Sequence, residues 1–181
     1  MKTIFKSLLL LLCLVPALAS AQSKIPQRNE IVSIEQEING VIEELEVFDS
    51  PRDGQHRYFL SVGHLGVGDD FIQMQVDPLF ELFIPLGETL EEAQEGLLEL
   101  KELIKSGKND VMMLTGCLSL AVPNDQLEPV KVVCRKLFVS KVLEFSVSRG
   151  NYVRATYLDK GDINSLINGV KFYRKLHPKE P

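Results

Sequence analysis

The feature that most constrains the fold is a repeated order of predicted elements, in which four strand-like runs are followed by an amphipathic helix. In the first half the predicted strands cover residues 41–48, 57–65, 71–76 and 79–86. In the second half they cover residues 111–122, 130–140, 142–148 and 152–158. Runs of β-branched and aromatic residues between turn residues are typical of strands. The repetition predicts an α+β fold made by tandem duplication of a four-strand-plus-helix unit, with two antiparallel sheets packed with two helices.

Local signals indicate where each helix begins. Thr89 and Glu92 have the spacing of a capping box, and an apolar stripe follows at Leu90, Ala93, Leu97, Leu100 and Ile104. Asp162 is the predicted N-cap of the second helix, whose stripe is Ile163, Leu166, Ile167, Val170, Tyr173 and Leu176. Both stripes predict helices with one buried face.

The first predicted strand, residues 41–48, has a competing interpretation. Apolar residues also recur at helical spacing through this region, at Ile31, Ile34, Ile38, Val41, Leu45 and Phe48. The Asn39-Gly40 pair argues against one continuous helix, and the repeat favours a strand. The sequence leaves residues 30–38 open between the two.

Residues 1–21 have the composition of a secretory signal peptide. Lys2 and Lys6 precede a short apolar run and a small-residue site at Ala19-Ser20-Ala21. The run is too short to span a bilayer, so the chain is predicted not to remain in a membrane after cleavage. The sequence predicts a secreted or periplasmic protein with one domain over residues 22–181, whose pseudo-repeats cover about residues 41–107 and 110–177.

Two cysteines, Cys117 and Cys134, remain after the signal peptide, and an oxidising compartment favours their pairing. They are nearly equidistant from the predicted turn at Asp125 and Gln126, so a hairpin would bring them opposite each other. The spacing predicts a structural disulfide that joins this hairpin.

The two halves carry opposite charge. The whole chain has a net charge of −5. Residues 22–110 have 19 acidic and 7 basic side chains, whereas residues 111–181 have 6 acidic and 11 basic ones. The predicted second sheet holds the candidate face for an anionic partner: Lys131, Arg135, Lys136, Lys141, Arg149 and Arg154. The alternative is that the two halves attract each other within the molecule.

The search for reaction chemistry yields no catalytic residue and no cofactor motif. His64, Asp69 and Asp70 are the only candidates for a metal site, near a glycine-rich turn. Glycine and aspartate are also ordinary turn residues, and the oxygen-ligand spacing of a calcium loop is missing. The sequence therefore predicts no metal, with these three residues as weak candidates.

In its order of elements the chain resembles the whirly and PUR-type single-stranded nucleic-acid binders. The resemblance covers the chain after residue 21 and implies a fold of two similar units. No motif residue is shared, and the acidic charge, the export signal and the lack of an aromatic-basic stacking motif disfavour nucleic acid as a partner.

The sequence predicts an exported, non-enzymatic binding or interaction domain whose partner is a protein or a glycan. Residues 49–55 and 66–70 are candidate contact loops. The alternative function is binding of an apolar small molecule, in a pocket lined by Phe71, Met74, Phe80, Phe83, Met112 and Met113. A metal-dependent enzyme is the third possibility.

Overall fold

The computed structural model describes residues 27–38, 41–51, 57–63, 66–67, 81–106, 110–120, 126–137, 140–149 and 152–178. Its strands in the first half are β1 (Asn29–Ile38), β2 (Val41–Asp49), β3 (Tyr58–Val62), β4 (Gly66–Val67) and β5 (Leu82–Gly87). The helix α2 (Leu90–Ser106) follows. The second half contains β6 (Val111–Gly116), β7 (Glu128–Leu137), β8 (Ser140–Arg149), β9 (Tyr152–Asp159) and the helix α3 (Lys160–Leu176).

The sheet topology confirms the α+β fold with a duplicated unit. Within the described residues, the first sheet has the order β1-β2-β3-β5 and the second has the order β4-β9-β8-β7-β6. Every pairing is antiparallel. Each unit is therefore a meander of four strands that leads into a helix, and the two-residue β4 extends the second sheet beside β9.

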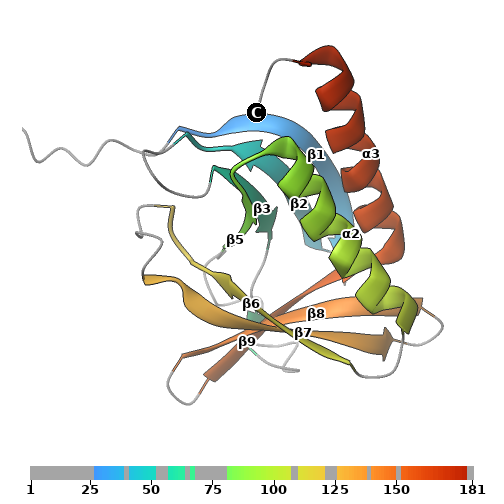
Figure 1. Ribbon diagram of the computed structural model, residues 1–181. Coiled ribbons are helices and arrows are strands. Elements are labelled where there is room, and N and C mark those ends of the chain that lie inside the picture. Colours follow the sequence, from blue (N-terminus) through green and yellow to red (C-terminus); the bar gives the residue numbers. More distant parts are fainter. Residues whose placement is uncertain are drawn as a thin grey trace, which may run out of the picture.

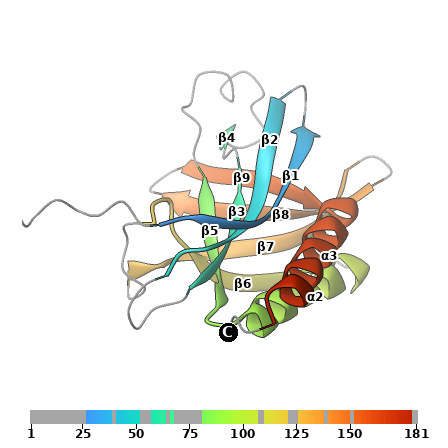
Figure 2. The same cartoon turned by 90° about the horizontal axis from the view of Figure 1, so that it is seen from above.

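The two sheets lie one above the other, and α2 and α3 run side by side along one flank of the pair (Figure 1). Seen from above, the strands of the first sheet cross those of the second steeply (Figure 2). One hydrophobic core joins both sheets and both helices. Its fully buried members include Tyr58, Leu60, Leu97, Phe145 and Leu166. The burial of large apolar side chains from both halves is the main force that holds the units together.

The predicted start of α2 is confirmed. The Glu92 backbone N–H donates to Thr89 Oγ1 at 3.2 Å, and the Thr89 N–H donates to Glu92 Oε2 at 3.3 Å. Gly87 reaches this cap with φ of +128°, and a Cβ added there would lie 2.5 Å from Glu92 Cβ. The turn between β5 and α2 therefore requires glycine.

The helix α3 begins earlier than the sequence predicts. Asp159, not Asp162, is its N-cap, and Asp162 completes a capping box with it. The Asp162 N–H donates to Asp159 Oδ1 at 2.9 Å, and the Asp159 N–H donates to Asp162 Oδ2 at 3.1 Å. Burial, with the nearby Asp159 carboxylate, raises the pKa of Asp162. The prediction was wrong because both aspartates fit a helix start, and only the end of β9 fixes which one caps it.

The first unit also begins earlier than predicted. Residues 29–38 form β1, and the predicted first strand at residues 41–48 is the second strand, β2. Ile38 pairs with Val41, which closes a tight hairpin and excludes the helical interpretation. Apolar residues lie on both faces of β2, where Leu45 and Phe48 are both fully buried, and this two-sided burial imitates helical spacing. The predicted strand at residues 71–76 lies outside the described residues.

The structure does not show the predicted disulfide between Cys117 and Cys134, although both cysteines are buried. Val111 pairs with Val133, the residue before Cys134, and Gly116 pairs with Glu128. Cys117 therefore lies six residues beyond Val111, the residue opposite Val133. At the usual rise of a strand this offset separates the cysteines by about 20 Å, and a disulfide needs less than about 7 Å between Cα atoms. Cys134 belongs to the central core, whereas Cys117 belongs to a second cluster with Phe48, Phe59 and Phe83.

Candidate functional site

The candidate functional site is a groove between α2 and the end strands of the two sheets, called the α2 groove below. One part, of about 620 Å³, is lined by Glu95, Leu98, Glu99, Glu102, Leu103, Ser106, Asp110 and Met112. A second part, of about 250 Å³, lies against Ile84, Pro85, Leu86, Glu92, Gly96, Leu100 and Leu114 as well as Glu95, Glu99 and Met112. Because the two parts share three residues, they form one continuous groove.

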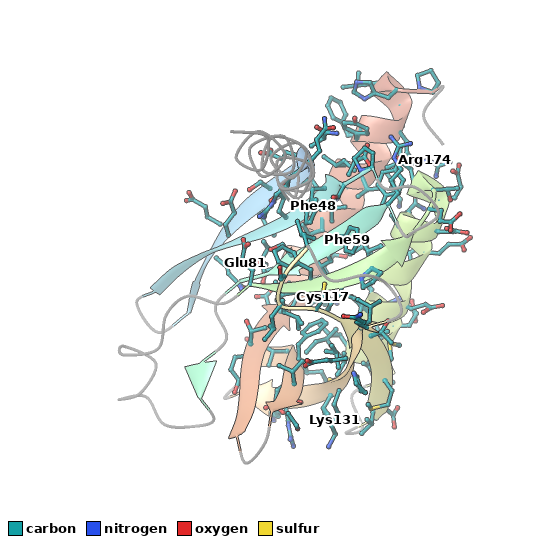
Figure 3. The ribbon with its side chains drawn as sticks, turned by 90° about the vertical axis from the view of Figure 1, so that its left-hand side faces the viewer. Phe48, Phe59, Glu81, Cys117, Lys131 and Arg174 are labelled. Atoms are coloured by element: carbon teal, nitrogen blue, oxygen red, sulfur yellow. The ribbon has the colours of Figure 1, made fainter. Side chains whose placement is uncertain are left out.

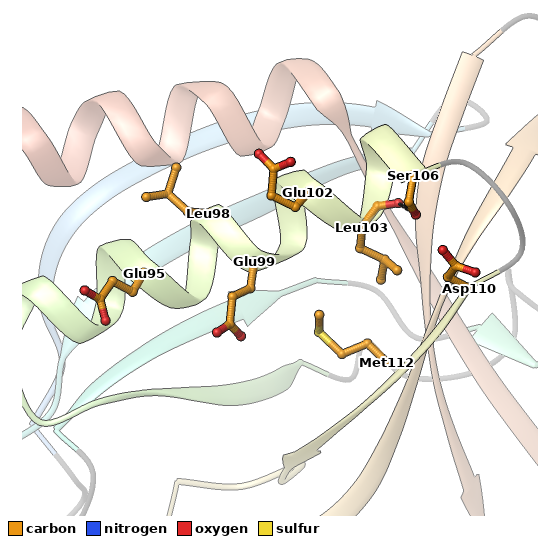
Figure 4. A pocket seen from close by; sticks show the side chains of 8 residues that line it. All are labelled: Glu95, Leu98, Glu99, Glu102, Leu103, Ser106, Asp110 and Met112. Atoms are coloured by element: carbon orange, nitrogen blue, oxygen red, sulfur yellow. Dashed lines mark hydrogen bonds between the residues drawn. The ribbon is translucent and has the colours of Figure 1, made fainter.

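The periodicity of α2 positions the acidic side of the groove. Glu95, Glu99 and Glu102 follow one another at helical spacings of four and three residues, so they lie along one flank of the helix. Leu98 and Leu103 lie beside them, and Met112 approaches from β6 (Figure 4). These glutamates are not among the predicted site residues, although their helical spacing in the sequence is a signal of an acidic flank.

The groove is acidic over an apolar floor. Among the described residues, Glu95, Glu99 and Asp110 have no ion-pair partner, whereas Glu102 pairs with Lys105 one turn along α2. Leu98 and Met112 are partly buried against the central core. Such a surface can bind a ligand that carries both positive charge and apolar groups.

Two sheet edges frame the α2 groove, because β5 ends the first sheet and β6 ends the second. Phe83 of β5 exchanges backbone hydrogen bonds of 2.9 Å with Cys117, the residue after β6. Gly116 permits this approach, since a Cβ there would lie 3.0 Å from the Phe83 carbonyl oxygen and 2.9 Å from Val130 Cγ2. Among the described residues β6 has no strand partner on its outer edge, so an extended segment can pair there, whereas Pro85 removes one backbone donor from β5.

Of the six residues predicted to line an apolar pocket, the three that the structure describes do not come together. Met112 lies in the α2 groove, Met113 is 60% exposed on β6, and Phe83 is buried in the second cluster. Phe71, Met74 and Phe80 lie outside the described residues.

The predicted anionic-partner residues are divided between several positions. Lys131 and Arg135 are exposed at alternate positions of β7, and Arg135 pairs with Glu144 at 3.2 Å. Lys136 and Lys141 face each other across β7 and β8, near the end of that hairpin. Of the remaining two, Arg149 pairs in register with Tyr152 and Arg154 with Val147.

Lys141 also lines a separate hollow of about 490 Å³ with Lys105 and Lys160. Attraction between the halves is carried by another residue, because Arg174 of α3 bonds Glu91 and Gln94 of α2.

The three weak metal candidates, His64, Asp69 and Asp70, lie outside the described residues. In the part of the chain that the structure describes, no three His, Cys, Asp or Glu side chains are grouped so that they could hold a metal ion. No helix in that part combines the length and the apolar character needed to cross a membrane.

A second notable region is the outer face of the first sheet, which turns away from the central core. Phe48 and Phe59 lie close together on it (Figure 3), and Phe83 is buried in the same cluster. Arg28, just before β1, lies over this cluster and donates from Nε to Glu46 Oε2 at 2.6 Å. Burial raises the pKa of the Glu46 carboxyl above its ordinary value, and the neighbouring Glu44 and Glu30 act in the same direction while Arg28 opposes them.

This raised pKa makes the contribution of Glu46 to stability depend on pH. The folded state holds the Glu46 proton more tightly than the unfolded state, so the contribution is fully present below the unfolded pKa and is lost as pH rises through the folded one. We expect the free energy of unfolding of the native protein, relative to Glu46→Gln, to fall as pH rises from about 4 towards neutrality. Urea unfolding of both proteins across this range measures the difference; a difference that rises with pH would contradict the assignment.

Comparisons with family models, with curated proteins and with solved structures found no match to this chain.

Proposed function

We propose that this protein is an exported, non-enzymatic binding domain whose α2 groove takes up a basic, amphipathic segment of a partner protein. The observation that carries the proposal is the continuity of the groove, which joins unpaired carboxylates to an apolar floor beside a free strand edge. The absence of catalytic motifs in the sequence supports a binding role over an enzymatic one.

The chemistry of the groove selects the partner. Glu95, Glu99 and Asp110 attract lysine or arginine side chains, because among the described residues no cation neutralises them. Leu98 and Met112 offer apolar contact, and the flexible methionine side chain adapts to different shapes. In an extended segment with alternating basic and apolar residues, the basic side chains would meet the carboxylates and the apolar side chains would meet the apolar floor. The backbone of the segment could pair with β6.

The exported location is part of the proposal and rests on the leader at residues 1–21. Lys2, Lys6 and the small residues at Ala19-Ser20-Ala21 support cleavage before Gln22. N-terminal sequencing of the protein recovered from the native host would test this: a start at Gln22 supports export, and an intact Met1 in the cytoplasmic fraction contradicts it.

The binding proposal predicts the effect of charge reversal in the groove. We expect Glu95→Lys combined with Glu99→Lys to weaken binding of an alternating Lys-Leu peptide of about ten residues by roughly tenfold or more, because attraction becomes repulsion at two positions. Isothermal titration calorimetry at low salt measures the dissociation constant, which should rise with ionic strength.

The matched control makes the same charge change elsewhere. Glu30 and Glu35 are exposed on β1, in the first sheet. Glu30→Lys with Glu35→Lys should leave peptide affinity within about twofold if the groove is the site, because screening weakens distant charges. Equal losses in both double variants would contradict a groove site. If a Glu-Leu peptide bound with the same affinity as the Lys-Leu peptide, the result would favour the alternative function, a site for apolar ligands whose affinity does not depend on charge.

A further inference from the structure

The outer face of the first sheet has a composition that solvent-facing sheet surfaces lack. Phe48 and Phe59 are fully buried there, with ring centroids 5.7 Å apart, and Phe83 packs edge-on to Phe48 at 5.9 Å. Glu46 lies on the same face of β2 as Phe48, and its side chain is only 7% exposed. A buried carboxylate is costly unless a cation is paired with it.

Arg28 supplies that cation in a defined geometry. Its guanidinium carbon lies 4.7 Å from the Phe48 ring centroid and 5.8 Å from that of Phe83. The same group pairs with Glu46, and its Nη1 donates to the two Glu81 carboxylate oxygens at 3.3 and 3.2 Å. One planar cation is therefore held by two aromatic rings and two carboxylates.

This arrangement fits a guanidinium better than an ammonium. A planar guanidinium can stack on an aromatic ring while its edge donates several parallel hydrogen bonds, whereas an ammonium is a compact, strongly hydrated point charge. Glu46 accepts from Nε of Arg28, and Glu81 accepts from both Nη1 and Nη2 of the same side chain. The number and direction of these bonds match the fork of arginine.

We propose that the outer face of the first sheet is a guanidinium-binding site, formed by Phe48, Phe83, Glu46 and Glu81, which the chain's own Arg28 fills. The four residues come from β2 and β5 and from the position just before β5, whereas Arg28 comes from the position before β1. The ligand is thus not part of the two elements that build the site. The ligand class is an arginine side chain, which a partner can supply when Arg28 is absent. This site is separate from the α2 groove, so its test does not depend on the proposed function.

The test is chemical rescue of Arg28→Ala. This variant leaves Glu46 buried and unpaired, so its melting temperature should fall by about 5 °C or more. N-ethylguanidinium at about 10 mM should then raise that melting temperature by roughly 3 °C, as expected for a ligand with millimolar affinity. Ethylammonium at the same concentration should raise it much less.

Two further variants show where the rescue occurs. Arg135→Ala removes an exposed arginine that pairs with Glu144 on the second sheet, so N-ethylguanidinium should not raise its melting temperature. Adding Glu46→Gln to Arg28→Ala should abolish the rescue. Equal rescue by both cations, or rescue that persists without the Glu46 charge, overturns the site. If Arg28→Ala does not fold, its refolding yield with each cation is compared, and a selective gain with N-ethylguanidinium supports the same conclusion.

Discussion

Replacing Phe48 by alanine is expected to lower the free energy of unfolding by about 4 kcal/mol, the range for large buried aromatic side chains. Phe48 is fully buried, and it contacts the rings of Phe59 and Phe83 and the guanidinium of Arg28. The lost stability has two parts: the free energy of transferring the ring out of water, and the cost of the cavity that the missing ring leaves. Urea unfolding at neutral pH measures it.

Phe172→Ala is the matched control, because Phe172 is 64% exposed on α3. Its loss should remain within about 0.5 kcal/mol. The double variant of Phe48→Ala with Arg28→Ala should be less destabilised than the two single losses together, because each single variant already removes the cation–aromatic contact. Strict additivity would show that Phe48 and Arg28 do not interact, and a loss for Phe48→Ala no larger than for Phe172→Ala would show that the cluster of Phe48, Phe59 and Phe83 does not stabilise the fold.

Gly169→Ala is expected to destabilise the protein by about 2 kcal/mol, although alanine ordinarily favours a helix over glycine by about 1 kcal/mol. A Cβ on Gly169 would lie 2.3 Å from Val32 Cγ2 and 2.6 Å from Val32 Cβ, so β1 and α3 would have to move apart. The contact joins the first strand of one unit to the helix of the other. Thermal or urea unfolding measures the change.

A double-variant cycle separates this steric cause from helix propensity. Val32→Ala removes the methyl groups in the way, so Gly169→Ala should cost less in the Val32→Ala protein than in the native one. Asn168→Ala, at an exposed neighbouring position of α3, is the propensity control and should be neutral or slightly stabilising. A stabilising Gly169→Ala would refute the close packing of α3 on β1.

The helices could be predicted from the sequence because their signals are local. The capping box at Thr89 and Glu92 and the apolar stripe of α2 lie within a few turns of chain, and the structure has both. Glycine disfavours a helix, and the reason for Gly169 within α3 is tertiary, because it provides room for Val32. A pattern within the helix sequence cannot predict a contact with a strand that is distant in the chain.

The pairing of the cysteines could not be predicted, because register depends on which face of each strand is buried. A disulfide requires Cys117 opposite Cys134, but β7 turns Val130, Val132 and Cys134 towards the core and pairs them with other residues. A strand that slips along its partner changes which side chains meet, and a slip of one residue reverses its faces. The burial of the whole strand therefore determines the register of β7, and the symmetry of two cysteines about a turn does not.

The α2 groove and the site around Arg28 also depend on tertiary structure. The glutamates of the α2 groove are at helical spacing in the sequence, but the groove exists only because β5 and β6 separate beside them. Arg28 is bound by Glu46, 18 positions further along the chain, and by Glu81, 53 positions further along, and the pairing of β1, β2, β3 and β5 brings these three residues together.

By itself the sequence determined the duplicated order of four strands and a helix, because strand and helix formation depend on periodicity, turn residues and caps within short segments. The tertiary structure alone decided the start of the first unit, the register of the strands, the separation of the cysteines and the places where charges meet. These depend on the burial of side chains far apart in the chain, and a free energy summed over the whole core selects among pairings that are locally equivalent.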